Sequence, residues 1–244
     1  MALRNPNTRH SVNAMLRALL VRLPIVLGLG LGGLVASGSQ AWAQGDGSVS
    51  VARVKYDGGG DWYSDEESLQ ELFAFARQHT LLDVAPREET IELTTDKLFT
   101  VPYLYLTGHG NVTFSEAEAE RLRRYLQQGG FLHVDDNYGL DEHIRPALET
   151  VFPEKELVEV PFDHPIYTTP YDFSDGLPKI HEHDGNPPKG YGYFDDQGRL
   201  MVFYTVETDL GDGWEPASVH DNPPEKRRAA LRMGTNILMY AMTH

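Results

Sequence analysis

Cysteine is absent from the chain, which has 244 residues. This absence excludes a disulfide framework, a thiolate nucleophile, a zinc site with cysteine ligands and a lipid-modified N-terminal cysteine. Basic residues are scarce as well: 21 Lys and Arg stand against 36 Asp and Glu, for a net charge of −15. Because binding to a nucleic-acid backbone needs clustered Lys and Arg, we expect no nucleic-acid partner. Hydrophobic residues make up 41% of the chain, which is enough for a folded core.

The N-terminus has the pattern of a secretory signal peptide. Residues 1–43 contain four Arg and no acidic residue, an apolar stretch over residues 23–36, and the small-residue motif Ala41-Trp42-Ala43. Cleavage is then expected before Gln44, and Met15 is an alternative start. The apolar stretch is shorter than the ~20 residues that a membrane-spanning helix needs. We therefore expect residues 1–43 to be a cleaved signal peptide, with no stable membrane span after cleavage.

The remainder is expected to be a single exported domain, periplasmic or secreted. Residues 44–50 are small and polar and predict a flexible leader, and residues 51–244 predict one domain of ordinary size. All 36 acidic residues and 17 of the 21 basic ones follow residue 43, so the mature chain carries a charge of −19. Such a charge keeps a protein soluble and repels nucleic acids and anionic lipids, and it also fits a high-salt habitat.

Strand and helix patterns alternate along the first part of this domain. Strands are expected over residues 51–56, 90–93, 102–107, 131–134 and 157–160. Two intervening helices are expected to begin at capping boxes, formed by Ser64 with Glu67 and by Ser115 with Glu118. A third helix carries Pro146, which a helix tolerates only in its first turn.

The pattern changes after residue 160. Residues 161–189 are rich in Pro and predict a long loop, and residues 191–194 and 199–206 predict a β-hairpin. A final helix is expected after Pro223-Pro224.

The alternation implies a mostly parallel sheet with helices on both faces. In such sheets ligands bind beyond the carboxyl ends of the strands. Three polar clusters follow predicted strands, at residues 57–61, 108–111 and 135–137. We therefore expect them to lie together at one edge of the sheet.

Four segments carry a family resemblance. They are Tyr56-Asp57-Gly58-Gly59 with Asp61-Trp62-Tyr63; Thr107-Gly108-His109-Gly110 leading to Gly129-Gly130-Phe131-Leu132-His133-Val134-Asp135-Asp136; His164-Pro165-Ile166-Tyr167 with Gly176-Leu177-Pro178; and Gly234-Thr235-Asn236-Ile237-Leu238-Met239-Tyr240. Together they resemble a bacterial family, domain of unknown function 4159 (DUF4159), whose fold is similar to that of class I glutamine amidotransferases. The resemblance implies a three-layer α/β sandwich with a mostly parallel, flavodoxin-like sheet, here with a C-terminal β-hairpin insertion and a terminal helix. It implies no activity.

Class I glutamine amidotransferases place a cysteine nucleophile on a sharp turn after a central strand. The comparable turn here reads Asp135-Asp136-Asn137. A carboxylate cannot perform the chemistry of a thiolate, so glutaminase activity is excluded.

Imidazole and carboxylate groups near this turn suit a divalent metal. The candidate ligands are His109, His133, Asp135 and His164, and the tract His181-Glu182-His183-Asp184 is a second group of the same kind. The spacing matches no established zinc motif. The alternative is that the Asp residues cap helices or close turns, without any metal.

The loop after the first strand points to a different ligand. Gly58-Gly59-Gly60 could cradle a phosphate, but Asp57 and Asp61 flank it and would repel an anion. A neutral, hydroxylated or cationic ligand is more compatible. Trp62 and Tyr63 beside these carboxylates suit the stacking of a sugar, although such residues also seal the edge of a core.

Three functions follow from these patterns, and the cofactor stays open apart from a divalent metal. The first, which we favour, is a non-catalytic exported domain that binds a small neutral or polyol ligand or an envelope protein partner. Its candidate binding residues are Asp57, Asp61, Trp62, Tyr63, His109, Asp135, Asp136, Asn137 and His164. The second is a metal-dependent hydrolase that uses His109, Asp135, Asp136 and His164. The third is a carbohydrate-binding or carbohydrate-processing protein, and Asp135, Asp136 and Asp61 are its candidate acids for glycoside hydrolysis.

Overall fold

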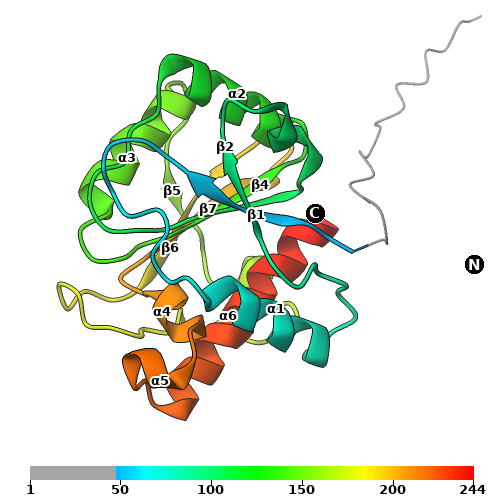
Figure 1. Cartoon of the computed structure of the whole chain (residues 1–244), viewed down its shortest axis with the longest axis vertical. Helices are drawn as coiled ribbons and strands as arrows, with labels where there is room; N and C mark the ends of the chain where they lie inside the picture. The colour runs from blue at the N-terminus through cyan, green and yellow to red at the C-terminus, as the bar shows by residue number, and fades with distance from the viewer. Residues whose placement is uncertain (1–47) are drawn as a thin grey trace, which may run out of the picture. The chain divides into compact units, whose positions relative to one another are not determined.

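The computed structural model describes residues 48–244 (Figure 1). The expected signal peptide and residues 44–47 of the leader lie outside the described residues. Val49, at the end of the expected leader, pairs with a neighbouring loop: its amide donates to the Asp83 carbonyl at 2.7 Å, and its carbonyl accepts from the Ala85 amide at 2.9 Å. The folded domain therefore includes Val49. Across residues 48–244, no helix combines the length and the apolar character needed to cross a membrane.

A seven-stranded sheet forms the centre of the domain, in the order β2-β1-β3-β4-β7-β6-β5. The strands are β1 (Val51–Lys55), β2 (Glu89–Glu92), β3 (Tyr103–Leu106), β4 (Phe131–Asp135), β5 (Val158–Glu159), β6 (Lys189–Phe194) and β7 (Leu200–Val206). Strands β1 to β4 and β7 are parallel, whereas β6 runs antiparallel to β7 and β5 antiparallel to β6. The prediction of a mostly parallel α/β sheet is confirmed, and so is the pairing of the last two predicted strands.

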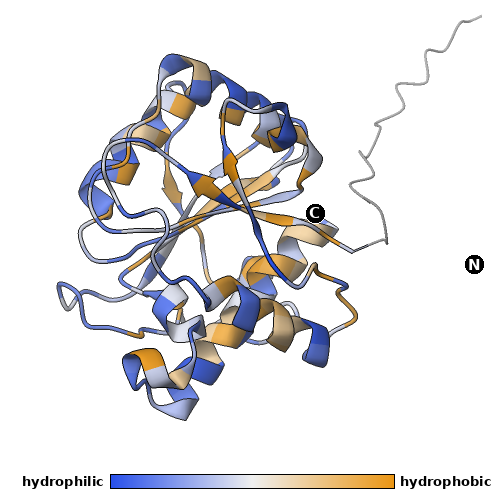
Figure 2. Ribbon diagram, viewed as in Figure 1, coloured by the Kyte–Doolittle hydropathy of each residue, from blue (hydrophilic) through white to orange (hydrophobic). Residues whose placement is uncertain are grey.

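Helices cover both faces of this sheet (Figure 1). The α-helices are α1 (Ser68–His79), α2 (Glu116–Gln127), α3 (Asp141–Val151), α4 (Leu210–Trp214), α5 (Ala217–His220) and α6 (Pro224–Thr243), and the 3-10 helices are η1 (Asp96–Thr100) and η2 (Pro165–Tyr167). Helices α2 and α3 pack on one face, and α1, α4 and α6 on the other. Every residue of β3 and β4 is buried, as expected for strands covered on both sides. Figure 2 shows the same division, with hydrophobic colour on the central strands and mixed colour along the helices.

The capping box predicted for α2 is confirmed. Ser115 Oγ accepts from the Glu118 amide at 3.3 Å, and Glu118 Oε2 accepts from the Ser115 amide at 2.8 Å. The helix ends at Gln127, before Gly129, whose φ of 105° is accessible to glycine at no steric cost.

The capping box predicted for the first helix is wrong, because α1 begins at Ser68, four residues later. The guanidinium of Arg53 in β1 explains the delay: it donates to the carbonyls of Ser64 and Asp65 at 2.7 and 3.0 Å. Asp65 also has a φ of 55°, which no right-handed helix accommodates. A long-range contact thus replaces the local cap, and Ser64 Oγ has no hydrogen-bond partner among the described residues.

Pro146 does not lie in the first turn of its helix, as the sequence led us to expect. Helix α3 begins at Asp141, so the proline falls in the second turn, and the helix continues to Val151. The lost bond would have reached the carbonyl of Glu142. Both Glu142 and Pro146 are exposed, so water can solvate that carbonyl and the helix continues without a partner there.

Candidate functional site

The loops that follow β1 and β3 bind each other at the carboxyl edge of the sheet. The Gly60 amide donates to the Asn111 carbonyl at 3.0 Å, and the Thr113 amide donates to the Asp57 carbonyl at 2.8 Å. A Cβ atom at Gly60 would lie 2.7 Å from the His109 carbonyl oxygen, so only glycine fits there. The predicted clustering of these two loops is therefore correct. The glycine-rich loop packs against its neighbour and does not form the open phosphate cradle that its sequence allowed.

Asp61 and His109 pair within this packed region. The backbone amide of His109 donates to Asp61 Oδ1, and its ring Nδ1 lies 3.0 Å from Asp61 Oδ2. Both side chains are partly exposed, at 36% and 54%. His109 thus contacts the β1 loop, although the predicted metal set placed it with Asp135.

His133 is fully buried inside the sheet. Its Nδ1 lies 3.2 Å from the Tyr103 hydroxyl and its Nε2 lies 3.1 Å from Thr205 Oγ1, so both ring nitrogens are engaged. Burial lowers the pKa of His133 to about 3. A neutral, enclosed imidazole of this kind supports the core.

His164 lies at the other end of the parallel strands, near their amino termini. Its Nδ1 accepts from the Ile166 amide at 3.3 Å at the start of η2, and its ring packs against Phe194 and Tyr240. Phe194 pairs with Leu200, the first residue of β7, whereas ligands in such sheets bind near the strands' last residues. The predicted metal set of His109, His133, Asp135 and His164 is therefore wrong as a group. The sequence could not reveal this, because the loop that carries His164 has no regular pattern.

Asp135, the last residue of β4, is fully buried and fully bonded. Its Oδ1 accepts from the hydroxyls of Thr205 and Thr208 at 2.6 and 3.1 Å, and its Oδ2 accepts from the Gly211 amide at 2.6 Å. Burial and the nearby negative charge of Asp209 raise the pKa of Asp135 to about 7, against these hydrogen bonds. Asp135 therefore joins β4 to β7 and α4, and it is fully buried with both oxygens bonded inside the protein.

Asp136 has a different environment, although its side chain is also largely buried. Its Oδ2 accepts one long bond from the Glu207 amide at 3.3 Å and lies 3.8 Å from His183 Nδ1, and its Oδ1 has no hydrogen-bond partner within residues 48–244. Burial raises the pKa of Asp136, and His183 opposes that rise. The next residue, Asn137, accepts from Thr107 Oγ1 at 2.8 Å and faces the chain interior. Of the three residues in this turn, Asp136 is the one that lines the cavity described next.

This cavity, which we call the Asp136 cavity, has a volume of about 750 Å³. It is lined by Asp136, Tyr138, Gly139, Asp141, Glu142, His143, His183, Asp184, Asn186, Pro187, Lys189, Tyr191, Val206 and Glu207. Carboxylates outnumber the basic groups in this lining. Tyr138 is 58% exposed, and its hydroxyl donates to Asp184 Oδ1 at 3.2 Å, which holds an aromatic ring at the mouth.

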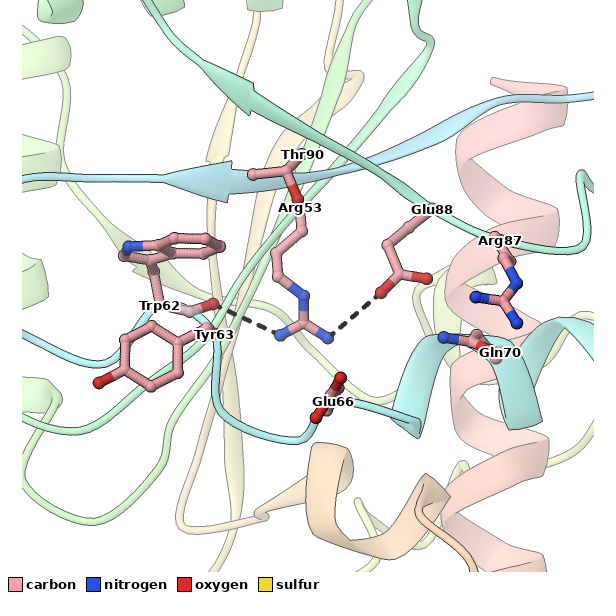
Figure 3. A pocket seen from close by; sticks show the side chains of 8 residues that line it. All are labelled: Arg53, Trp62, Tyr63, Glu66, Gln70, Arg87, Glu88 and Thr90. Carbon is pink, nitrogen blue, oxygen red and sulfur yellow. Dashed lines mark hydrogen bonds and ion pairs between the residues drawn. The ribbon is translucent and has the colours of Figure 1, made fainter.

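The predicted aromatic pair Trp62 and Tyr63 lines a second cavity of about 480 Å³ (Figure 3). The two rings meet edge to face with centroids 5.5 Å apart, and Tyr63 is 64% exposed. Figure 3 shows the guanidinium of Arg53 between the Trp62 carbonyl and Glu88, whose carboxylate it approaches to 3.8 Å. The buried guanidinium of Arg53 thus already has its partners within the protein. This cavity shares no lining residue with the Asp136 cavity.

A group of histidines and carboxylates lies beyond the carboxyl end of β7. The sequence pattern indicated it only in part. Within residues 48–244, one set could hold a metal: His181, Asp212 and His220, whose candidate ligand atoms all lie within 4.8 Å of one another. The tract at residues 181–184 pointed to one of these ligands. The other two follow β7, whose carboxyl end reaches the same edge as β4, and that position was the available signal.

Asp65 adds a buried carboxyl to this neighbourhood. Its pKa is raised to about 9 by burial and by the carboxylates of Asp212, Asp209 and Asp135, and it is hydrogen-bonded to Asp212. Several acidic side chains are therefore concentrated around Asp65, near Asp212, Asp209 and Asp135.

Comparison with other proteins bears on the family and not on the site. No curated protein matches this chain. Residues 50–242 match the family model described as "Domain of unknown function (DUF4159)", a span that covers nearly all of the described residues. The chain therefore belongs to the DUF4159 family.

Proposed function

We propose that the protein is an exported, non-catalytic binding domain and that a small, neutral, hydroxyl-rich ligand occupies the Asp136 cavity. One observation carries this proposal: Asp136 lines a cavity of about 750 Å³, and its buried Oδ1 has no hydrogen-bond partner within residues 48–244. A buried polar group without a partner costs about 1–3 kcal/mol, and more when it is charged. A ligand hydroxyl that donates to this oxygen would remove that cost.

The lining of the cavity supports the same class of ligand. The carboxylates of Asp136, Asp141 and Glu142 would repel an anion and can accept from hydroxyl groups. The exposed ring of Tyr138 offers an apolar face of the kind on which a sugar stacks. A neutral polyol or sugar fits both features.

A binding role is favoured over hydrolysis by the state of the two adjacent acids. Hydrolysis by a carboxylate pair requires two groups that both reach the substrate. Asp135 uses both oxygens inside the protein, so it cannot be the partner of Asp136. The hydrolase set that included His109 and His164 is not assembled either.

The proposal includes the finer description of the fold. The order β2-β1-β3-β4-β7 has the same form as the flavodoxin-like order 2-1-3-4-5, in which ligands bind at the carboxyl edge. On this basis we place the domain with flavodoxin-like folds such as class I glutamine amidotransferases, and we regard β5 and β6 as belonging to an inserted antiparallel element. Export rests on the N-terminal sequence pattern.

A binding screen on the purified protein tests the function. The probes are glucose, N-acetylglucosamine, trehalose and myo-inositol, followed by saturation-transfer NMR and calorimetry. Asp136→Asn puts a hydrogen-bond donor where Asp136 has an acceptor. The Asn oxygen must accept from the Glu207 amide, so its NH₂ group takes the position of Oδ1. Asp96→Asn is the matched control, since that side chain is fully exposed elsewhere on the surface.

We expect at least one probe to bind, and we expect Asp136→Asn to weaken binding about tenfold or more while Asp96→Asn leaves it unchanged. Tyr138→Ala should also weaken binding. The proposal is overturned if no probe binds, or if Asp136→Asn binds as well as the unaltered protein.

A further inference from the structure

Histidine and acidic side chains from three separate segments meet beyond the end of β7. His181 comes from the loop before β6, Asp212 from α4 and His220 from the end of α5. His181 Nδ1 lies 3.0 Å from Asp212 Oδ2, and His220 Nε2 lies 3.3 Å from Asp212 Oδ1. The two imidazole rings therefore approach the same carboxylate from different sides, with centroids 5.6 Å apart.

These separations suit a metal ion as well as hydrogen bonds. Zinc binds His nitrogen and carboxylate oxygen at about 2.0–2.2 Å, so neighbouring ligands of a tetrahedral ion lie about 3.4 Å apart. The two short distances end on different oxygens of Asp212, and one ligand atom from each of the three residues lies within 4.8 Å of the other two. Small side-chain rotations would bring all three groups onto one ion.

Asp209 supplies an independent indication of a missing partner. Its side chain is only 6% exposed, and its Oδ2 lies 2.8 Å from His181 Nδ1. Its Oδ1 has no hydrogen-bond partner within residues 48–244. A buried carboxylate oxygen without a partner therefore belongs to a side chain that contacts one of the three candidate ligands.

The local charge also favours a cation. Asp65 lies near Asp135, Asp209 and Asp212, whose negative charges raise its pKa, and Asp209 also lies near Asp135. Among the described residues, no Lys or Arg forms an ion pair with any of the four, and the ion pairs of Asp209 and Asp212 are with histidines. A divalent cation would compensate this charge where the chain itself provides no fixed one.

We propose that His181, Asp212 and His220 bind a first-row divalent transition-metal ion such as Zn²⁺, with Asp209 as a neighbouring carboxylate that contacts His181. Two imidazoles select such a metal over Ca²⁺ and Mg²⁺, which prefer oxygen ligands alone. The contact between Asp65 and Asp212 provides the outer hydrogen bond that commonly orients a ligand. His181 and His220 are 35% and 27% exposed, so an ion can enter from solvent. None of the three ligands lines the Asp136 cavity, and the link between the two places is His183, which lines that cavity and lies 3.0 Å from Asp209.

Calorimetric titration of the chelator-treated, purified protein with ZnCl₂ tests the site. CoCl₂ is titrated in parallel, because its visible spectrum reports nitrogen and oxygen coordination directly. His220→Gln removes one ligand, and His109→Gln is the control, because His109 was the metal ligand expected from the sequence and lies in another loop. Circular dichroism without metal checks that both variants fold like the parent.

We expect one zinc ion per chain, with affinity reduced at least about tenfold by His220→Gln and unchanged by His109→Gln. Cobalt should give the spectrum of a low-coordinate site in the parent and lose it in His220→Gln. Three results would overturn the proposal: no stoichiometric zinc binding, equal affinity in His220→Gln, or loss of binding in His109→Gln instead. If His220→Gln misfolds, His181→Gln replaces it under the same criteria.

Discussion

Asp135 and Asp136 are adjacent carboxylates, yet the structure predicts very different costs for their replacement by Asn. Asp135 accepts three hydrogen bonds, from Thr205, Thr208 and the Gly211 amide. An Asn side chain has one acceptor oxygen, which the fixed Gly211 amide requires, so both threonine hydroxyls must turn and accept from the new NH₂ group. Two bonds to a charged group, each worth about 1.5–3 kcal/mol, are lost or replaced by weaker ones. Relief from burying a charge offsets part of this, and we expect a net loss of about 2–4 kcal/mol.

The same change at Asp136 should cost less than at Asp135, about 1–2 kcal/mol, because the main loss is its 3.8 Å ion pair with His183. Its single backbone bond, from the Glu207 amide at 3.3 Å, survives because the Asn oxygen can accept it. The other oxygen has no partner within residues 48–244, so its conversion to NH₂ removes no hydrogen bond of the chain.

Urea unfolding at pH 8, where Asp135 is largely ionised, measures both values on the same scale. Equal slopes of free energy against urea confirm that the variants unfold from comparable states. The reasoning is refuted if Asp136→Asn destabilises the protein as much as Asp135→Asn, or if Asp135→Asn costs less than 1 kcal/mol.

Two further predictions concern stability. The folded pKa of His133 is lowered to about 3, so the folded state binds fewer protons than the unfolded state between pH 3 and 6.5, and stability is lost as the pH falls through that range. The quantity to measure is the unfolding free energy of the parent minus that of His133→Gln. It should rise by about 1.4 kcal/mol per pH unit between pH 4 and 6 and level off above pH 7. A difference that does not vary with pH would contradict this. Ser115→Ala should lose about 1 kcal/mol in thermal or urea unfolding because it removes a real cap, whereas Ser64→Ala should lose almost nothing; equal losses would show that the α1 cap exists after all.

The sheet could be predicted because its signal is local. Residues 103–106 and 131–135 are buried on both faces, and an almost uninterrupted apolar run already indicates such a strand. The cap at Ser115 was predictable for the same reason, since both partners lie within one helical turn. Parallel strands also bring their carboxyl ends to one edge, which correctly grouped Asp61 with His109.

The errors arise where distant segments decide the outcome. Ser64 fails as a cap because Arg53, eleven residues earlier, binds its carbonyl. His164 lies at the other end of the parallel strands because of the path of a long proline-rich loop, which no periodicity describes. The His181, Asp212 and His220 group depends on the folding back of two short helices after β7, so its members are separated in sequence and converge only in three dimensions.

The two outer strands of the sheet have a consequence for self-association. The order of strands leaves β2 and β5 at the edges, and a long, flat, apolar edge invites another chain to add a strand. Strand β5 has only two residues, and β2 begins and ends with glutamates that pair with Lys97 and Lys55. A second molecule could form few backbone hydrogen bonds with the short strand β5 and would face charged side chains at β2. Both outer strands therefore disfavour the strand addition that leads to fibrillar aggregation.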